Sequence, residues 1–138
     1  MSALPPPPTN EDGQNNMNKV WLITGASSGF GRALTLAATD AGDNVVACGR
    51  NMDALEELAA EAPDRITPLA YDVTDIAAAA GVIEEVLRRH GRLDVLVNNA
   101  GRGQVGAVED TTDEELRDIF DLHFFGPAAL TRAALPQM

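Results

Sequence analysis

The sequence predicts an α/β fold in which a doubly wound parallel sheet stops after about four strands. Short apolar runs alternate with segments of helical periodicity, a pattern typical of strands joined by crossover helices. A glycine-rich turn follows the first apolar run, where a strand-to-helix connection is expected. Right-handed crossovers place helices on both faces of such a sheet and give the expected strand order 3-2-1-4.

The first expected strand and helix are followed by a second strand. Lys19–Ile23 is a short apolar run. Ala33–Ala41 is rich in alanine and leucine and ends at Gly42, a residue that favours a helix end. Asn44–Cys48 is the next apolar run and therefore the second expected strand.

Capping residues mark the next two helices. Met52–Ala62 carries apolar residues at helical spacing, and Asn51 can cap it. Ile66–Ala70 is the third expected strand. A further helix is expected between Thr74, as its cap, and Gly91, as its stop. The apolar residues expected to form its inner face are Ile76, Ala79, Ala80, Ile83, Val86 and Leu87.

The fourth expected strand is Leu93–Val97. Thr112 and Glu115 have the spacing of a capping box, which predicts the start of the last helix. The apolar residues expected to share one face of this helix are Leu116, Ile119, Phe120 and Phe124.

Residues 1–18 differ from the rest of the chain. Pro5–Pro8 favours an extended polyproline conformation, and the segment after it is polar. We expect a flexible N-terminal tail, with a ligand for proline-binding domains as the alternative. Residues 19–138 are expected to form one ordered domain.

Composition narrows the possible partners. The formal net charge of −11 repels phosphate backbones, so nucleic acid is excluded as a partner for the whole molecule. Cys48 is the single cysteine, which precludes an intramolecular disulfide and fits a reducing compartment. No apolar run approaches the roughly 18 residues of a membrane span, and no signal peptide is apparent. We therefore expect a cytoplasmic protein without a membrane partner.

The run Thr24–Gly31 has the glycine spacing G-x-x-x-G-x-G. Glycines at a strand-to-helix turn let the chain bend and let backbone N–H groups approach an anion at the start of the helix. The turn lacks a Gly-Lys-Ser/Thr ending, which disfavours nucleotide hydrolysis. An ordinary glycine-rich turn is the alternative. The predicted phosphate-binding residues are Gly25, Ser27, Ser28, Gly29, Phe30 and Gly31.

The end of the second strand bears on the choice of nucleotide. A carboxylate there selects NAD by binding the ribose hydroxyls. Instead, Gly49 leaves space and is followed by Arg50 and Asn51. Arg50 can pair with a 2′-phosphate, so NADP is favoured over NAD. Asp43 lies at the wrong end of the strand to supply the carboxylate. The alternative is that Arg50 is a solvated loop cation.

Two further segments complete a pattern. Asn98-Asn99-Ala100-Gly101 follows the fourth strand, and Asp72-Val73 follows the third. Together with Thr24–Gly31, they closely resemble the short-chain dehydrogenases/reductases over residues 19–138. The resemblance implies a Rossmann-type NAD(P)-binding domain. It also implies an Asp that accepts a hydrogen bond from the adenine amine, and an Asn-Asn-Ala-Gly segment on the nicotinamide side. The residues that it adds to the cofactor site are Asp72, Val73, Asn99, Ala100 and Gly101.

Two of these residues also have a structural interpretation. Asp72 could cap the helix that follows it, and Asn98 could satisfy backbone groups at the end of the sheet. Either role is compatible with cofactor binding.

The resemblance implies hydride transfer between nicotinamide and a carbonyl or alcohol carbon of a small molecule. In this family a Ser and a Tyr-x-x-x-Lys pair carry that chemistry, and they follow the fourth strand and helix. Tyr71 is the only tyrosine here and ends the third strand, so no such pair is present. We therefore expect the domain to be incomplete at its C-terminus, and this chain alone to be inactive.

Two alternatives remain open. The chain could be a non-catalytic NAD(P)-binding module, or it could bind nothing stably and expose the edge of its fourth strand. Full-length relatives are expected to be homo-oligomers, and no metal site is expected.

His123 stands where the family has an Asn that acts in a proton relay through its backbone carbonyl. Pro127 lacks an N–H, so the carbonyl of His123 loses its helical donor and stays free for a relay water. For the side chain, the favoured alternative is a core histidine on the apolar face of the helix. The glycine-rich loop from Arg102 to Glu109 is expected to edge the substrate cleft, with Arg102 an exposed loop cation.

Overall fold

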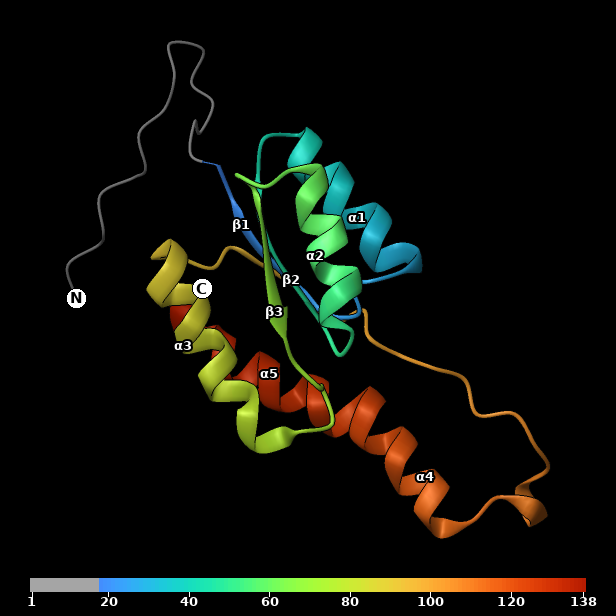
Figure 1. Cartoon of the computed structure of the whole chain (residues 1–138). Coiled ribbons are helices and arrows are strands. Elements are labelled where there is room, and N and C mark those ends of the chain that lie inside the picture. Colours follow the sequence, from blue (N-terminus) through green and yellow to red (C-terminus); the bar gives the residue numbers. More distant parts are fainter. Residues whose placement is uncertain (1–17) are drawn as a thin grey trace.

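The computed structural model describes residues 18–138 and contains one parallel sheet with the predicted strand order β3-β2-β1-β4 (Figure 1). Apart from Asn18, the predicted flexible tail lies outside the described residues. The strands are β1 (Val20–Ile23), β2 (Asn44–Gly49), β3 (Ile66–Ala70) and β4 (Val95–Val97). The predicted α/β fold with a doubly wound sheet is therefore confirmed.

All the strand pairings are parallel, so the carboxyl ends of the four strands meet at one edge of the sheet. Leu22 in the centre of β1 pairs with Val46 of β2 and Leu96 of β4. Ligands of doubly wound folds bind outside this carboxyl edge. The loops that leave the edge are therefore the segments to examine for a site.

Helices cover both faces of the sheet. In Figure 1, α1 and α2 lie on one side and α3 and α5 on the other, while α4 extends away from the sheet. The α-helices are α1 (Gly29–Asp40), α2 (Met52–Glu61), α3 (Ala79–His90), α4 (Asp113–Phe120) and α5 (Gly126–Ala134). Short 3₁₀ turns are η1 (Ile76–Ala78), η2 (Val108–Asp110) and η4 (Leu135–Gln137), and η3 (Asp121–Phe125) is a π-helical turn. Within residues 18–138, no helix is both long and apolar enough to cross a membrane.

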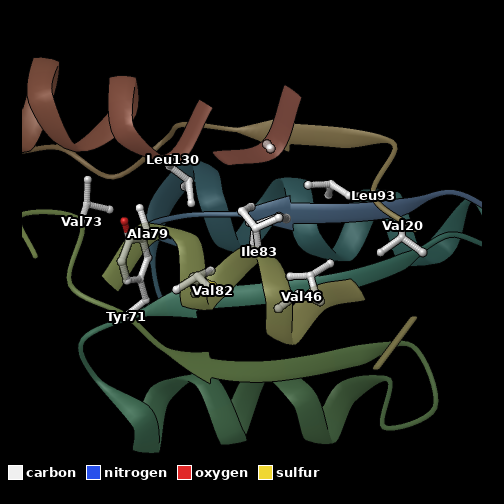
Figure 2. Packing of buried hydrophobic residues seen from close by; sticks show 13 residues of the cluster. Val20, Val46, Tyr71, Val73, Ala79, Val82, Ile83, Leu93 and Leu130 are labelled. Atoms are coloured by element: carbon white, nitrogen blue, oxygen red, sulfur yellow. The ribbon is translucent and has the colours of Figure 1, made fainter. Parts of the chain in front are cut away.

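Each face of the sheet has its own core. Figure 2 shows the cluster between the sheet and α3 and α5, where Val46, Ile83 and Leu130 are buried. On the opposite face, Ile23 of β1 packs with Leu55 of α2. Cys48 is fully buried in the α3/α5 cluster, and burial raises the pKa of its thiol to about 12. Cys48 therefore remains a protonated core residue.

Several element boundaries differ from the sequence prediction. Helix α1 begins at Gly29, well before the expected Ala33, so the last glycines of the turn form its first turn. Thr74 does not cap the next helix, because α3 begins only at Ala79 after a 3₁₀ turn. Ile76 is exposed as a result, since it belongs to that turn and not to the helix face.

The apolar face predicted for the last helix is present but is not buried. The capping box of Thr112 and Glu115 forms as expected. However, Leu116, Phe120 and Phe124 are each exposed by roughly half. The helical pattern predicted amphipathicity correctly but could not show whether another element lies against the apolar face.

We predict that truncating a leucine lowers the free energy of unfolding much more in the buried sheet than on exposed α4. Leu22→Ala should lower the free energy of unfolding by about 2–5 kcal/mol, because Leu22 is fully buried in the centre of the sheet. Leu116→Ala should change it by no more than about 0.5 kcal/mol, because Leu116 is exposed on α4. Urea denaturation of the two variants checks this, and equal losses would contradict the packing described.

Candidate functional site

A cleft of about 690 Å³ lies at the carboxyl edge of the sheet. It is bounded by the loops after all four strands and by the segment where α4 meets η3. The structure brings most of the predicted site residues together in its wall: Gly25, Ser27, Ser28, Phe30, Arg50, Asn51, Asp72, Val73, Asn99, Ala100 and Gly101. Gly29, Gly31 and His123 do not line it.

The turn between β1 and α1 uses its glycines in different ways. Gly25 and Gly29 have φ values of 63° and 55°, in the left-handed region that favours glycine. A Cβ at Gly25 would lie only 2.8 Å from the Cα of Ala100, so this residue also allows two loops to touch. A Cβ at Gly29 would meet nothing within 4 Å. At Gly29 the positive φ favours glycine, and no neighbouring group excludes a side chain.

Gly31 serves packing. A Cβ there would lie 2.2 Å from the carbonyl oxygen of Gly25 and 2.6 Å from Nδ2 of Asn99. No side chain fits without moving the backbone of the turn. Gly31 therefore lets the first turn of α1 sit directly against the loop after β4.

A buried hydroxyl joins these two loops. Thr24 is 1% exposed, and its Oγ1 accepts hydrogen bonds from the backbone N–H groups of Asn99 and Ala100, both at 3.0 Å. The same hydroxyl donates to the carbonyl of Val97 at 3.4 Å. One threonine side chain thus satisfies three backbone groups of the loop that leaves β4.

The side chain of Asn99 forms hydrogen bonds in the opposite direction, from the loop after β4 to the turn after β1. Its Nδ2 donates to the carbonyl oxygens of Thr24 at 3.0 Å and Gly25 at 3.1 Å. The turn after β1 and the loop after β4 are therefore held by reciprocal hydrogen bonds between segments more than 70 residues apart in sequence. We call this set of contacts of Thr24 and Asn99 the loop lock.

The start of α1 has the chemistry of an anion site. Ser28 is its N-cap, but the serine side chain makes no capping hydrogen bond. The first turn contains no acidic residue, and the helix is 12 residues long. Because the first backbone N–H groups of a helix lack partners within it, they suit a phosphate group.

The end of β2 presents an exposed cation to the cleft. Arg50 lines both the main cleft and a shallower hollow beside it, in which Asp53 is the acidic residue. A Cβ at Gly49 would make only ordinary contacts, the nearest at 3.6 Å from Oγ of Ser27, and Gly49 itself lines the cleft beside Arg50. Asn51 caps α2 as predicted, because its Oδ1 accepts from the N–H of Ala54 at 3.1 Å.

Asp43 is engaged at the other end of the sheet, as the sequence indicated. Its carboxylate accepts from the N–H of Lys19 and from Nε1 of Trp21, both at 2.9 Å. Asp43 does not line the cleft.

Asp72 faces the cleft as a carboxylate. Its Oδ1 accepts from Oγ1 of Thr74 at 2.7 Å and from the N–H of Thr74 at 2.9 Å. These hydrogen bonds lower the pKa of the Asp72 carboxyl, and the charge of Arg50 adds to the effect. The interpretation of Asp72 as the cap of the next helix is wrong, because it orders a turn that ends before η1 and α3. Thr74 occupies Oδ1, and within residues 18–138 no group donates a hydrogen bond to Oδ2.

The two asparagines after β4 have separate roles. Asn99 belongs to the loop lock, whereas Nδ2 of Asn98 donates to Oγ1 of Thr131 on α5 at 3.1 Å. The interpretation that Asn98 satisfies backbone groups at the sheet end is therefore wrong, and Asn99 fulfils that role.

His123 is not the core histidine that the apolar face of its helix suggested. The residue is exposed, and its Nε2 lies 2.8 Å from the carbonyl oxygen and 3.3 Å from the backbone nitrogen of Arg102. The apolar pattern misled because the ring turns toward the loop after β4. Arg102 itself is exposed, as predicted, and lines the cleft.

Sequence reasoning missed part of the cleft wall: Tyr71, Thr74, Asp118, Asp121 and Leu122. Tyr71 precedes Asp72 directly, which was a usable signal. It is 6% exposed, its hydroxyl finds no hydrogen-bond partner among residues 18–138, and burial raises its pKa. Asp118, Asp121 and Leu122 reach the cleft only because α4 runs into it, and nothing in their spacing indicated that.

The part of the chain that the structure describes contains no candidate metal site. Among residues 18–138, no group of three or more His, Cys, Asp or Glu side chains is arranged to hold a metal ion.

Comparison with known proteins identifies a family. Residues 19–138 match the family model described as short chain dehydrogenase. "Dehydrogenase/reductase SDR family member 7B" of Bos taurus is 41% identical over 130 residues, which cover 88% of this chain and 40% of that protein. A short-chain dehydrogenase from Streptomyces avermitilis superimposes with a TM-score of 0.86 at 58% identity, covering 91% of this chain and 46% of that one.

Two other similar structures hold nicotinamide cofactors. A 3-ketoacyl-(acyl-carrier-protein) reductase from Brucella melitensis complexed with NADH has a TM-score of 0.82, 34% identity and coverage of 86% and 49% of the two chains. An alcohol dehydrogenase from Thermococcus sibiricus complexed with 5-hydroxy-NADP has a TM-score of 0.83, 30% identity and coverage of 88% and 53%. The chain thus spans about half or less of the length of the proteins that it matches.

We predict that the loop lock depends on the Thr24 hydroxyl. Thr24→Val keeps the shape of the side chain but leaves the part-buried N–H of Ala100 without its acceptor, whereas the N–H of Asn99 keeps a second acceptor, the carbonyl of Val97 at 3.1 Å. The free energy of unfolding should fall by about 1–3 kcal/mol, which is the cost of leaving one such group unsatisfied.

Thr24→Ser is the matched control, because it retains the hydroxyl and loses only a methyl group. Chemical denaturation should show it to be clearly more stable than Thr24→Val. If the two variants are equally destabilised, packing of the methyl group and not hydrogen bonding holds the loops together.

Proposed function

The chain belongs to the short-chain dehydrogenase family, and on that premise we propose that it forms the NADP(H)-binding part of an oxidoreductase. The reaction proposed for the whole protein is hydride transfer between nicotinamide and the carbonyl or alcohol carbon of a small molecule. The observation that supports this best is the cleft, where the loop lock holds an anion site beside the predicted nicotinamide-side segment.

The residues present fit a dinucleotide. The first turn of α1, where Ser28 and Phe30 line the cleft and no serine side chain caps the helix, suits a pyrophosphate. Asp72 is held as a carboxylate in the cleft wall, which suits an acceptor for the adenine amine. When bound, the nicotinamide ring would supply the site that gives or takes the hydride. We assign the nicotinamide side to Asn99, Ala100 and Gly101.

We propose NADP over NAD because of the end of β2. Arg50 is the basic residue on both hollows there, and Gly49 lines the cleft beside it. A guanidinium pairs well with a phosphate dianion. Asp43, a carboxylate of the same strand region, is engaged at the opposite end of the sheet.

We propose that His123 takes part in a proton relay through its backbone carbonyl. Pro127 has no N–H to offer the carbonyl of His123, and the helix is widened to a π turn over Asp121–Phe125. We propose that this carbonyl holds a water that passes protons in the full-length enzyme. A full-length structure in which the carbonyl of His123 is bonded within the helix would exclude this role.

A second candidate is a non-catalytic NAD(P)-binding module. The observation that favours it is the single tyrosine, Tyr71, which lies in the α3/α5 core and is not followed by a lysine four residues later. Sequencing the coding region past the codon of Met138 separates the two candidates, because an in-frame Ser and Tyr-x-x-x-Lys would support the enzyme.

We predict that the purified chain binds NADPH more tightly than NADH, because only NADPH offers Arg50 a 2′-phosphate. Arg50→Ala should weaken NADPH binding about 10-fold to 100-fold, the range expected for a hydrogen bond to a charged group, and should leave NADH binding unchanged. Fluorescence titration measures both dissociation constants.

Arg88→Ala is the control, since Arg88 is an exposed arginine of α3 paired with Glu85 outside the cleft. It should not alter either constant. Equal affinity for both nucleotides in the unaltered chain and in Arg50→Ala would exclude the NADP assignment. No binding of either would favour a chain that binds no nucleotide stably.

A further inference from the structure

His123 joins two segments of the cleft that are 21 residues apart in sequence. Its imidazole comes from η3, and the backbone that it contacts belongs to Arg102, directly after Gly101. A Cβ at Gly101 would lie only 2.6 Å from Cε1 of His123. The ring therefore occupies the space in which a side chain of Gly101 would stand, and it packs flush against this loop.

The position of the ring depends on how the helix is anchored. Gly126 ends the π turn, and its N–H donates to the carbonyl of Asp121 five residues earlier. A Cβ at Gly126 would lie 2.4 Å from the carbonyl oxygen of Val73, so the helix touches the loop after β3 at this point. The π turn is thus fixed against Val73 at one end and reaches Arg102 through His123 at the other.

Nε2 of His123 can form either of two hydrogen bonds with the backbone of Arg102. Nε2 lies within hydrogen-bond distance of both the carbonyl oxygen and the backbone nitrogen of Arg102. One ring nitrogen either carries a proton and donates, or has a lone pair and accepts. It cannot bond both groups at once. A protonated ring can only donate, so it can bond only the carbonyl.

We propose that His123 is a positioning residue, whose imidazole fixes the backbone of Gly101 and Arg102 at the cleft wall in one of two hydrogen-bonded states. The neutral ring has access to both states, through its two tautomers. The protonated ring is restricted to the state in which Arg102 offers its carbonyl. Since both loop residues line the cleft, the choice sets the shape of its predicted nicotinamide side. That consequence alone rests on the proposed function.

Charged side chains stand on the segments that meet at this ring. Of these, Arg102 on the loop, Asp118 on α4 and Asp121 on η3 line the cleft.

The second histidine, His90, lies away from the cleft. Its Nε2 is 3.3 Å from the side-chain oxygen of Thr67, and neither residue lines the cleft. Burial, followed by the charge of Arg89, lowers the pKa of His90. His90 is therefore a control for general effects of histidine protonation.

Hydrogen exchange of the ¹⁵N-labelled chain tests the proposal without a cofactor. We expect the protection factor of the Arg102 amide to fall as pH is lowered from about 8 to about 5, in step with the ring resonances of His123. The fall should be about fivefold, as expected for the loss of one ordinary hydrogen bond. His90→Asn should leave this response unchanged.

Two substitutions at position 123 separate hydrogen bonding from simple packing. An Asn amide has a donor and an acceptor at the same time, so His123→Asn should keep the Arg102 amide protected at both pH values. His123→Ala should lose the protection at both. Gly101→Ala should also lose it, because the new Cβ displaces an intact imidazole. Dispersed amide spectra of each variant establish that it is folded, so the outcome reports on the contact.

The proposal is overturned if protection of the Arg102 amide does not follow the ring of His123, or if His123→Ala retains it. NADPH titration of the same variants at both pH values then asks whether the loop state alters the cleft. Protonation of the 2′-phosphate affects both proteins alike, so we expect the dissociation constant of His123→Asn to change less with pH than that of the unaltered chain. If the unaltered chain binds no NADPH, the cofactor assignment fails while the exchange result still decides the role of His123.

Discussion

A buried threonine hydroxyl holds the functional edge of this protein together. Oγ1 of Thr24 accepts from two backbone N–H groups of the loop after β4, and Nδ2 of Asn99 donates back to the turn after β1. Parallel strands bring their carboxyl ends to one edge but do not decide how the loops beyond that edge are arranged. These reciprocal contacts do, because they fix two loops whose polar groups would otherwise be buried without partners. Gly31 is a consequence of this arrangement, since any side chain there would push the loops apart.

Much of this part of the molecule could be predicted from sequence, because it depends on local patterns. Alternating apolar runs and helical segments predicted the strand order, and the glycine spacing predicted the sharp turn between β1 and α1. The individual roles of the glycines were harder to assign. Gly25 and Gly29 both adopt positive φ, but only at Gly25 does another loop lie where a side chain would stand. Only the neighbouring loop, distant in sequence, distinguishes them.

The opposite wall of the cleft could not be predicted in the same way. The amphipathic pattern of α4 was correct, but an apolar stripe does not show whether anything covers it, and Phe120 and Phe124 are exposed. The same pattern suggested a core position for His123, whose ring instead contacts the backbone of Arg102. The residue type and position of Thr74 predicted a helix cap. Instead, its N–H and hydroxyl donate to the carboxylate of Asp72 and form a separate turn. In each case a tertiary contact prevailed over a local preference.

The two contacts made by the loop after β4 differ in burial. In the loop lock the hydroxyl of Thr24 is buried and serves two N–H groups of the loop, so losing it costs more than losing an exposed hydrogen bond. The contact between His123 and Arg102 is exposed, so water competes for both backbone groups and the alternatives lie close in free energy. The segment proposed for the nicotinamide side, Asn99 to Gly101, is therefore held at one end by the loop lock and packed at the other end against the ring of His123.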